Sequence, residues 1–308
     1  MPRIKLSDEI TVHTFPKPPK NFDPLKSDEK TLARYGFPSR PEDPKLAARW
    51  EAVMSRGVRF IAPQFRAMPY KRRRLPQASA AEHGVESTDI WSGAVVHAPA
   101  GDSFRWVEGT WTVPNAYPPG NAEDLVWYSA STWVGIDGID GSGDVLQAGC
   151  DSDVMRFFGF TSRQLNPWWE WFPAGTFWIS NFTISQGDTV NCLICVTAGS
   201  NTEATIYLYN LTSNIAVHFM ATAPKGTSLV GNSAEWIVER LEIDTNAPEL
   251  AQYGDVYFSE ANAGTAKAKL LQGGTGNTIN MVDGGNVISE GIIQNASVVE
   301  VKYTGPLS

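Results

Sequence analysis

The chain has 308 residues, 42% of them hydrophobic and 19% charged, which is ordinary for a globular protein with a substantial core. No run of about 18 apolar residues occurs, so the sequence excludes a conventional membrane-spanning helix. The chain has three cysteines, at positions 150, 192 and 195, and so small and odd a number argues against a disulfide framework.

Charge is unevenly distributed along the chain. Residues 1–85 contain 17 Lys/Arg and 9 Asp/Glu, a net charge of +8, whereas residues 86–308 contain 8 and 24, a net charge of −16. Residues 86–308 carry few basic side chains, so their net positive charge stays small even when every carboxylate is protonated. Electrostatic self-repulsion of the folded chain in acid therefore stays small. This composition suits a protein that works at low pH.

Residues 1–85 are rich in proline and are predicted to form a basic, partly helical N-terminal extension. Asp43 is a good N-cap, Pro44 suits the first helical position and Gly57 follows the last turn, so a helix is predicted between them. A shorter helix is expected over residues 28–35. Further on, the basic cluster Tyr70-Lys-Arg-Arg-Arg74 is expected to be a solvated linker, a processing site or an electrostatic clamp.

From residue 86 the pattern changes to β-strands separated by turn residues. β-rich runs occur at residues 91–98, 104–113, 126–136, 168–172, 189–197, 205–211, 234–241, 256–258 and 297–303. No segment with a convincing helical period follows residue 90. Many short strands with this spacing predict one all-β domain, a sandwich or barrel, over residues 86–308.

Familiar catalytic and metal-binding signatures are absent from the sequence. It has no GxSxG, HExxH or phosphate-binding loop, and its four histidines lie far apart. Cys192 and Cys195 form a CxxC inside a strand-like run, where odd spacing sends the two thiols to opposite faces. Neither metal binding nor redox chemistry is therefore predicted, and no cofactor, nucleic acid or membrane partner is expected.

Several blocks, in order, resemble the glutamic peptidases, also called eqolisins. They are Trp91-Ser-Gly-Ala-Val-Val96, Val107-Glu-Gly-Thr-Trp-Thr-Val-Pro114, Ser131-Thr-Trp-Val-Gly-Ile-Asp-Gly138, Val145-Leu-Gln-Ala-Gly149, Trp168-Trp-Glu-Trp-Phe-Pro173, Ile184-Ser-Gln-Gly-Asp188, Ala234-Glu-Trp-Ile-Val-Glu239 and Tyr253-Gly-Asp-Val256. The resemblance implies an antiparallel β-sandwich of the concanavalin or jelly-roll kind. It also implies an acid-acting endopeptidase that hydrolyses polypeptides with an activated water and no cofactor.

The family's catalytic dyad, a glutamine and a glutamate, falls on Gln147 and Glu239. The resemblance also assigns four residues that line or support the cleft: Trp133, Asp137, Asp151 and Glu170. Peptide hydrolysis needs a base for water and a donor for the developing oxyanion, and a carboxylate and an amide can supply these. Because side chains alternate along a strand, we expect Gln147 and Glu239 to meet only if their strands are neighbours in one sheet.

Two questions stay open at the level of sequence. A Trp-rich β-sandwich also fits a carbohydrate-binding protein or a glycosidase, for which Glu235 and Glu239 are the candidate carboxylates. On a flat strand, however, they would be about 13 Å apart, too far for either glycosidase geometry. The extension resembles a prosegment in position, and it is predicted to dock on the acidic domain as a removable cover or a permanent brace.

Localisation is not decided by the sequence. The family resemblance implies secretion, whereas Met1–Phe15 has scattered charges and no apolar stretch typical of a standard secretory signal.

Overall fold

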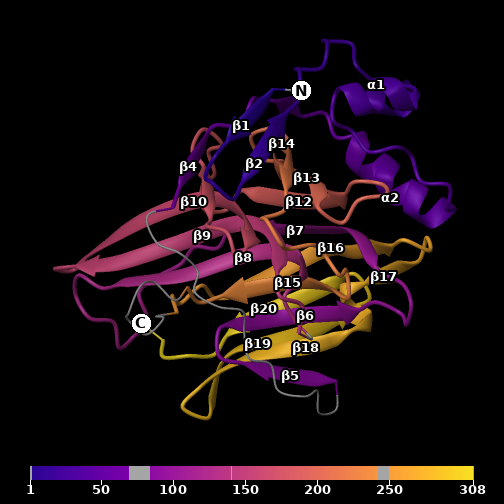
Figure 1. Cartoon of the computed structure of the whole chain (residues 1–308). Helices are drawn as coiled ribbons and strands as arrows, with labels where there is room; N and C mark the ends of the chain where they lie inside the picture. Colours follow the sequence, from indigo (N-terminus) through magenta and orange to yellow (C-terminus); the bar gives the residue numbers. More distant parts are fainter. Residues whose placement is uncertain (1, 69–83, 140, 242–249, 308) are drawn as a thin grey trace.

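The computed structural model describes residues 2–68, 84–139, 141–241 and 250–307, and Figure 1 shows it to consist mainly of antiparallel β-strands. The helices are α1 (Glu29–Arg34) and α2 (Pro44–Met54), with short 3-10 turns η1 (Pro24–Lys26) and η2 (Gly273–Thr275). No helix in the described part of the chain is long and apolar enough to span a membrane. The all-β prediction is confirmed.

The N-terminal strands are β1 (Arg3–Lys5), β2 (Thr11–Thr14), β3 (Arg59–Phe60), β4 (Phe65–Ala67) and β5 (Val85–Thr88). Those that follow up to residue 196 are β6 (Trp91–His97), β7 (Phe104–Thr112), β8 (Trp127–Asp137), β9 (Val145–Phe157), β10 (Phe160–Phe172), β11 (Phe177–Ile179) and β12 (Thr189–Val196). The remainder are β13 (Glu203–Asn210), β14 (Ile215–Thr222), β15 (Ser233–Glu239), β16 (Asp255–Thr265), β17 (Leu270–Gln272), β18 (Asn277–Asp283), β19 (Asn286–Asn295) and β20 (Val298–Tyr303).

The strands form two packed layers. One layer, called sheet A here, runs in the order β1, β2, β14, β13, β12, β7, β16 and β17. The other, sheet B, runs in the order β4, β11, β10, β9, β8, β15, β6, β18, β19 and β20. Strand β16 joins the layers, because its first residues pair with β20 and its later ones with β7. The register shifts between Ser259 and Asn262, where Glu260 has φ +53°, and such a bulge bends a strand.

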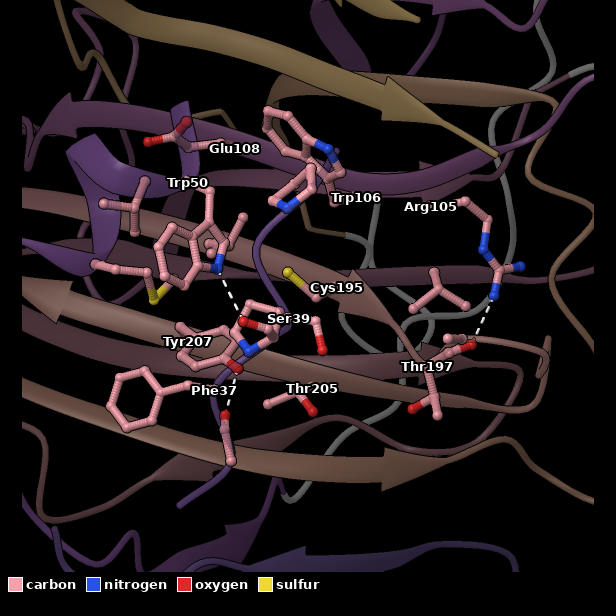
Figure 2. A pocket seen from close by; sticks show the side chains of 18 of the residues that line it. Phe37, Ser39, Trp50, Arg105, Trp106, Glu108, Cys195, Thr197, Thr205 and Tyr207 are labelled. Carbon is pink, nitrogen blue, oxygen red and sulfur yellow. Dashed lines mark hydrogen bonds between the residues drawn. The ribbon is translucent and has the colours of Figure 1, made fainter. Parts of the chain in front are cut away.

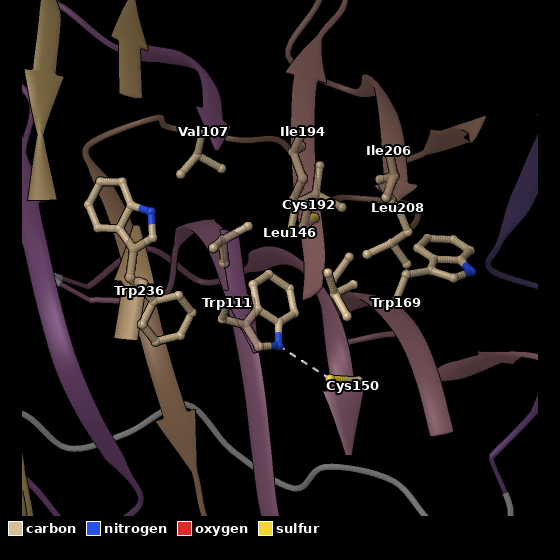
Figure 3. Close-up of a cluster of buried hydrophobic side chains, with 14 of the residues drawn as sticks. Val107, Trp111, Leu146, Cys150, Trp169, Cys192, Ile194, Ile206, Leu208 and Trp236 are labelled. Carbon is tan, nitrogen blue, oxygen red and sulfur yellow. Dashed lines mark hydrogen bonds between the residues drawn. The ribbon is translucent and has the colours of Figure 1, made fainter. Parts of the chain in front are cut away.

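The main hydrophobic core fills the space between the two sheets. Figure 3 shows Trp111 of β7, Trp169 of β10 and Trp236 of β15 among aliphatic side chains of β9, β12 and β13. The indole of Trp111 also donates to Sγ of Cys150 at 3.4 Å. Since alternate residues of a strand face opposite sides, each strand of sheet B keeps a second face outside this core.

Both helices predicted in the extension are confirmed. The Asp43 carboxylate accepts from the backbone N–H groups of Lys45 and Leu46, so it caps α2 as expected. Asp28 caps α1 in the same way, through the N–H of Thr31.

The extension also contributes strands to both sheets. Strands β1 and β2 form a hairpin along the edge of β14, and β3 lies parallel to another part of β14. Strand β4 pairs with β11 at the edge of sheet B. The predicted basic cluster at residues 70–74 lies outside the described residues.

Helix α2 packs on the outer face of sheet A. Trp50, Val53 and Met54 contact Leu193 and other side chains of β12 and β13. Figure 2 shows a pocket of about 480 Å³ at this junction, with Trp50 on one side and Tyr207 on the other. The CxxC prediction is also confirmed, since Cys195 faces this layer whereas Cys192 lies in the main core.

Beside this pocket lies a buried cluster of ion pairs. The fully buried carboxylate of Glu108 accepts from Nη2 of Arg49 at 2.9 Å and from Nη2 of Arg56 at 3.2 Å. The same two guanidinium groups contact Glu260, which also accepts from Thr110 at 2.7 Å. Burial raises the pKa of Glu108, against the opposing effect of the two arginines. The extension therefore supplies both positive charges next to a buried carboxyl group of sheet A.

We predict that the double variant Arg49→Met/Arg56→Met loses about 3–5 kcal/mol of unfolding free energy at pH 7, because it leaves Glu108 buried and unpaired. The folded variant would bind a proton at Glu108 more tightly than the unfolded chain does. The loss should therefore shrink as the pH falls. Urea denaturation at pH 7 and pH 4 measures both effects. Arg40→Met is the control, since the Arg40–Glu51 pair is exposed and should contribute less than about 1 kcal/mol. A similar loss in both proteins would contradict the prediction.

Candidate functional site

The two predicted catalytic residues lie on the same face of sheet B. Gln147 of β9 is directly opposite Gly135 of β8, and Glu239 of β15 is directly opposite Ser131 of β8. The registers are continuous along both pairs, so alternation puts all four residues on the face that points away from the main core. Gln147 and Glu239 are both buried.

The expectation that their strands are neighbours is wrong. Strand β8 lies between β9 and β15 and pairs with both. The reason is local: β8 and β9 form a hairpin across a short connection, which leaves the other edge of β8 for β15. Gln147 and Glu239 are therefore separated by one strand.

The indole of Trp133 bridges that separation. Its Nε1 donates to Oε2 of Glu239 at 2.9 Å. At the other end of the ring, Cζ3 lies 2.9 Å from the position that a Cβ on Gly135 would occupy, and Cβ of Gln147 lies 3.3 Å from the same position. Because a side chain on Gly135 would displace the ring, the glycine lets one indole extend from the Gln147 row to Glu239. Gly149 of β9 also lies close to Trp133, because a Cβ added to this glycine would be 2.6 Å from Cβ of Trp133.

A chain of hydrogen bonds holds the Gln147 amide. Its Nε2 donates to Oε2 of Glu170 at 2.8 Å, and Glu170 is the residue directly opposite on β10. The hydroxyl of Thr176 donates to the other oxygen of Glu170 at 2.7 Å. All three side chains are buried. Within the described part of the chain, Oε1 of Gln147 is buried and has no hydrogen-bond partner.

A second chain of hydrogen bonds lies in the row of Glu239. The indole of Trp168 donates to Oγ of Ser131 at 3.1 Å, and Ser131 donates to Oδ1 of Asp151 at 2.5 Å. Ser131 is flanked by Asp151 on β9 and by Glu239 on β15. The structure thus brings five of the six predicted residues onto three adjacent rows of one sheet face: Gln147 and Glu170, then Trp133, then Asp151 and Glu239.

Asp137 is the exception, because it lies at the end of β8 and braces a loop. Its carboxylate accepts from the backbone N–H groups of Val230, Gly231 and Asn232 at 2.7–3.0 Å. Burial raises the pKa of Asp137, while these hydrogen bonds act in the opposite direction. The bonded loop leads directly into β15, so Asp137 helps to position the strand that carries Glu239.

Sequence reasoning missed two polar residues of this face, Ser131 and Thr176. Ser131 is flagged only by its spacing of two from Trp133, which predicts a shared face. Thr176 lies beyond the end of β10, in the link to β11, and no pattern in the sequence connects it with Glu170. Glu235, considered above only as a sugar-site carboxylate, lies opposite Gly135 in the row of Gln147.

No group of three His, Cys, Asp or Glu side chains suited to a metal ion occurs among the described residues. The chemistry available on this face is that of carboxylates, an amide and indole N–H donors. Such groups can move a proton and stabilise a developing oxyanion.

A buried carboxyl group just before β9, that of Asp144, predicts a pH-dependent stability. Burial raises the pKa of Asp144 to about 6, and the nearby charge of Asp137 adds to this effect against the hydrogen bond from Trp171. The folded protein then binds this proton more tightly than the unfolded chain. The contribution of this proton to the unfolding free energy is complete below the pKa of the unfolded chain, about 4, and is lost as the pH rises through about 6.

Through Asp144, the wild type should lose about 2–3 kcal/mol of unfolding free energy between pH 4 and pH 7. We predict that Asp144→Asn abolishes this loss. The asparagine oxygen can still accept from Trp171, so the variant should match the wild type at pH 4 and exceed it at pH 7. Urea denaturation across this range is the measurement. Parallel stability curves for the two proteins would contradict the assignment.

Comparison with known sequences gives three matches. A family model described as the Peptidase A4 family matches residues 89–303. Aspergillopepsin-2 of Aspergillus niger is 30% identical over 229 residues, which are 69% of this chain and 77% of that protein. Scytalidopepsin B of Scytalidium lignicola is 32% identical over 208 residues, which are 64% of this chain and 72% of that protein.

Solved structures resemble the chain over a similar span. Scytalido-glutamic peptidase with a transition state analog inhibitor matches with a TM-score of 0.58 and 24% identity, covering 70% of this chain and 98% of that one. Aspergilloglutamic peptidase from Aspergillus niger matches with a TM-score of 0.50 and 30% identity, covering 57% and 99%. The first similarity shows a shared fold.

Proposed function

The chain belongs to the Peptidase A4 family, the glutamic peptidase (eqolisin) family that its motifs resemble, and we propose that it is an acid-acting endopeptidase with Glu239 and Gln147 as its catalytic dyad. The observation that carries the proposal is the placement of these two side chains at opposite ends of the Trp133 indole, on one sheet face. Each is held by a buried neighbour, and preorganised groups of this kind lower a reaction barrier.

Glu239 acts as the general base in this proposal. Its ionised carboxylate takes a proton from a water molecule, and the water oxygen attacks the carbonyl carbon of the scissile peptide. The same proton then passes to the departing amine as the C–N bond breaks. The N–H of Trp133 holds Oε2 of Glu239 in place at 2.9 Å, which orients the carboxylate.

Gln147 acts as the electrophilic partner. One N–H of its amide is held by Glu170, so the second N–H can donate to the oxyanion of the tetrahedral intermediate. Because an amide does not titrate, this donor keeps working in acid.

The intervening strand gives the reaction its space. Two steps across a sheet separate the backbones of β9 and β15 by about 9–10 Å. Gln147 and Glu239 also stand two rows apart, about 13 Å along the strands, so the substrate has to extend over Trp133 to reach both. We therefore expect the scissile bond above β8, near Trp133 and Gly135.

The proposed substrate is a polypeptide. Two solved relatives are described as complexes with a peptide-based transition state analog and with the tripeptide Ala-Ile-His. Family membership supports peptide hydrolysis over the carbohydrate-binding or glycosidase alternative. Trp133, Asp151 and Glu170 are proposed to contact or position the substrate, and Asp137 to position β15.

For the N-terminal extension we propose the role of a permanent brace rather than a removable cover. The support is the buried cluster in which Arg49 and Arg56 neutralise Glu108, together with the pairing of β2 with β14. Cutting away residues 1–85 would expose one edge of sheet A and leave Glu108 without its positive partners.

We predict that Glu239→Gln lowers kcat/KM by about 10²–10⁴-fold and that Gln147→Ala lowers it by about 10²–10³-fold. The assay is hydrolysis of an acid-denatured protein between pH 2 and pH 7, with chelator present throughout. Glu290→Gln, an exposed carboxylate on β19, is the isosteric control and should retain full activity. Full activity of folded Glu239→Gln would reject the proposed dyad.

Thr176 is predicted to act through Glu170 on Gln147. Thr176→Val removes the hydroxyl at nearly constant volume, so Glu170 loses one anchor and should hold the amide less firmly. We expect kcat to fall about tenfold with KM within about twofold of wild type. Thr176→Ser restores the hydroxyl and should recover most of kcat. Equal losses in both variants would assign Thr176 a packing role only.

A further inference from the structure

The tip of the β9–β10 hairpin carries three exposed phenylalanines. Phe157, Phe158 and Phe160 are 47%, 69% and 77% exposed, and the rings of the first two contact each other with centroids 5.1 Å apart. Figure 1 shows this hairpin projecting beyond the rest of sheet B. Soluble proteins seldom cluster large apolar side chains in solvent unless the cluster binds something.

The turn itself is built at a conformational cost. Phe158 has φ +44° and Gly159 has φ +88°, so both central residues are left-handed, as in a type I′ turn. Asparagine, aspartate or glycine normally takes the first of these positions, and a bulky residue there is disfavoured. An aromatic ring that is both strained and exposed adds little to the stability of the hairpin, which indicates a use in binding.

The aromatic tip shares a sheet face with the proposed catalytic residues. Along β9, alternation puts Phe157 on the same side as Gln147 and Asp151. Phe160 is directly opposite Phe157, and the partly exposed Trp127 is opposite Met155 in the row next to them. The register is unbroken over the whole hairpin, so the apolar side chains continue the face that carries the dyad.

We propose that Trp127, Met155, Phe157, Phe158 and Phe160, here called the aromatic strip, bind an apolar segment of the polypeptide substrate at a distance from the scissile bond. This inference rests on the peptidase function proposed above. The row of Phe157 lies eight residues beyond that of Gly149, which is opposite Trp133, or roughly 26 Å along the strand. An extended substrate rises by the same amount per residue, so the segment bound there would lie about eight residues from the cleaved bond.

The surroundings favour a polypeptide over an anionic lipid surface. The two cations of the hairpin lie within three residues of the phenylalanines, but both are engaged: Arg156 donates to the backbone oxygen of Ala122 at 2.9 Å, and the guanidinium of Arg163 lies 4.8 Å from the ring centre of Tyr117. What the tip offers is therefore apolar and aromatic contact, which suits the side chains of an unfolded chain.

The test uses the variant Phe157→Thr/Phe158→Asn/Phe160→Thr. Threonine suits a strand and asparagine suits the left-handed turn position, so the variant should fold with an unchanged or raised melting temperature. Val287→Thr on β19 is the matched control, since it removes an exposed apolar side chain at a different hairpin.

Three kinds of synthetic substrate share one cleavage sequence: a hexapeptide, a longer peptide with Phe-Leu-Phe about eight residues from the bond, and a longer peptide with Ser-Gly-Ser at the same place. Each longer peptide is made in two versions, with the triplet on one side of the bond or on the other. We expect the triple variant to lose about tenfold in kcat/KM for the apolar long peptide on one side and to keep wild-type rates on the hexapeptide. The Val287 control should match the wild type on every substrate. Equal rates of wild type and triple variant on all three would overturn the proposal.

Binding separates the aromatic strip from the catalytic proposal. Fluorescence anisotropy of the labelled apolar peptide on Glu239→Gln, with and without the triple substitution, measures the strip in a protein disabled for turnover. Binding that depends on the phenylalanines, in a wild type that cleaves nothing, would reject the dyad and keep the strip. Sedimentation with anionic vesicles that the triple substitution abolishes, combined with unchanged peptide binding, would instead assign the tip to lipid and overturn the proposal.

Discussion

The requirement that buried polar groups find partners organises the outer face of sheet B. Gln147, Glu170, Asp151 and Glu239 are all buried there, although such groups are costly to remove from water. Cross-strand neighbours provide the compensation, because residues directly opposite each other on paired strands lie within hydrogen-bonding reach. Trp133 is central to the arrangement, since its one N–H holds Glu239 and its ring fills the space above two glycines.

Strands suit this task better than loops would. The strands that carry these polar side chains point their alternate residues into the main core. There Trp111, Trp169 and Trp236 fill the space between the sheets, and this packing fixes the strand register. A shift of one residue in β9 would move Gln147 into that core. The hydrophobic interior therefore determines the positions of the polar groups on the opposite side, and the site requires little further ordering when a ligand arrives.

The N-terminal extension contacts both layers of the sandwich: β4 pairs with β11 in sheet B, and the N–H of Met68 donates to the backbone oxygen of Thr176 at 3.0 Å. Helix α2 covers the outer face of sheet A, opposite the face that carries Gln147 and Glu239. The strongest contacts of the described part of the extension are the pairs of Arg49 and Arg56 with the carboxyl groups of Glu108 and Glu260. The basic extension, with a net charge of +8, and the acidic domain, with −16, thus interact through these buried ion pairs. The contact of Met68 with Thr176 also joins the extension directly to the residue that holds Glu170.

The sequence by itself determined the class of fold, the family, both helices of the extension and the type of residue at each site position. Alternation along strands and capping at helix ends are local properties, so they can be read from neighbouring residues. It also indicated that Gln147, Gly149 and Asp151 share one face. The predicted runs did not include strands β14, β18 and β19, and the sequence led to a wrong expectation about which strands adjoin.

Only the tertiary structure decided that β8 lies between β9 and β15, that Trp133 extends from the Gln147 row to Glu239, and that Thr176 reaches Glu170. Strand order depends on which edges remain free after the local hairpins have formed, and on how both sheets close over a common core. Such pairings join residues about a hundred positions apart, as Ser131 and Glu239 are joined here, and no periodicity within a short segment encodes them.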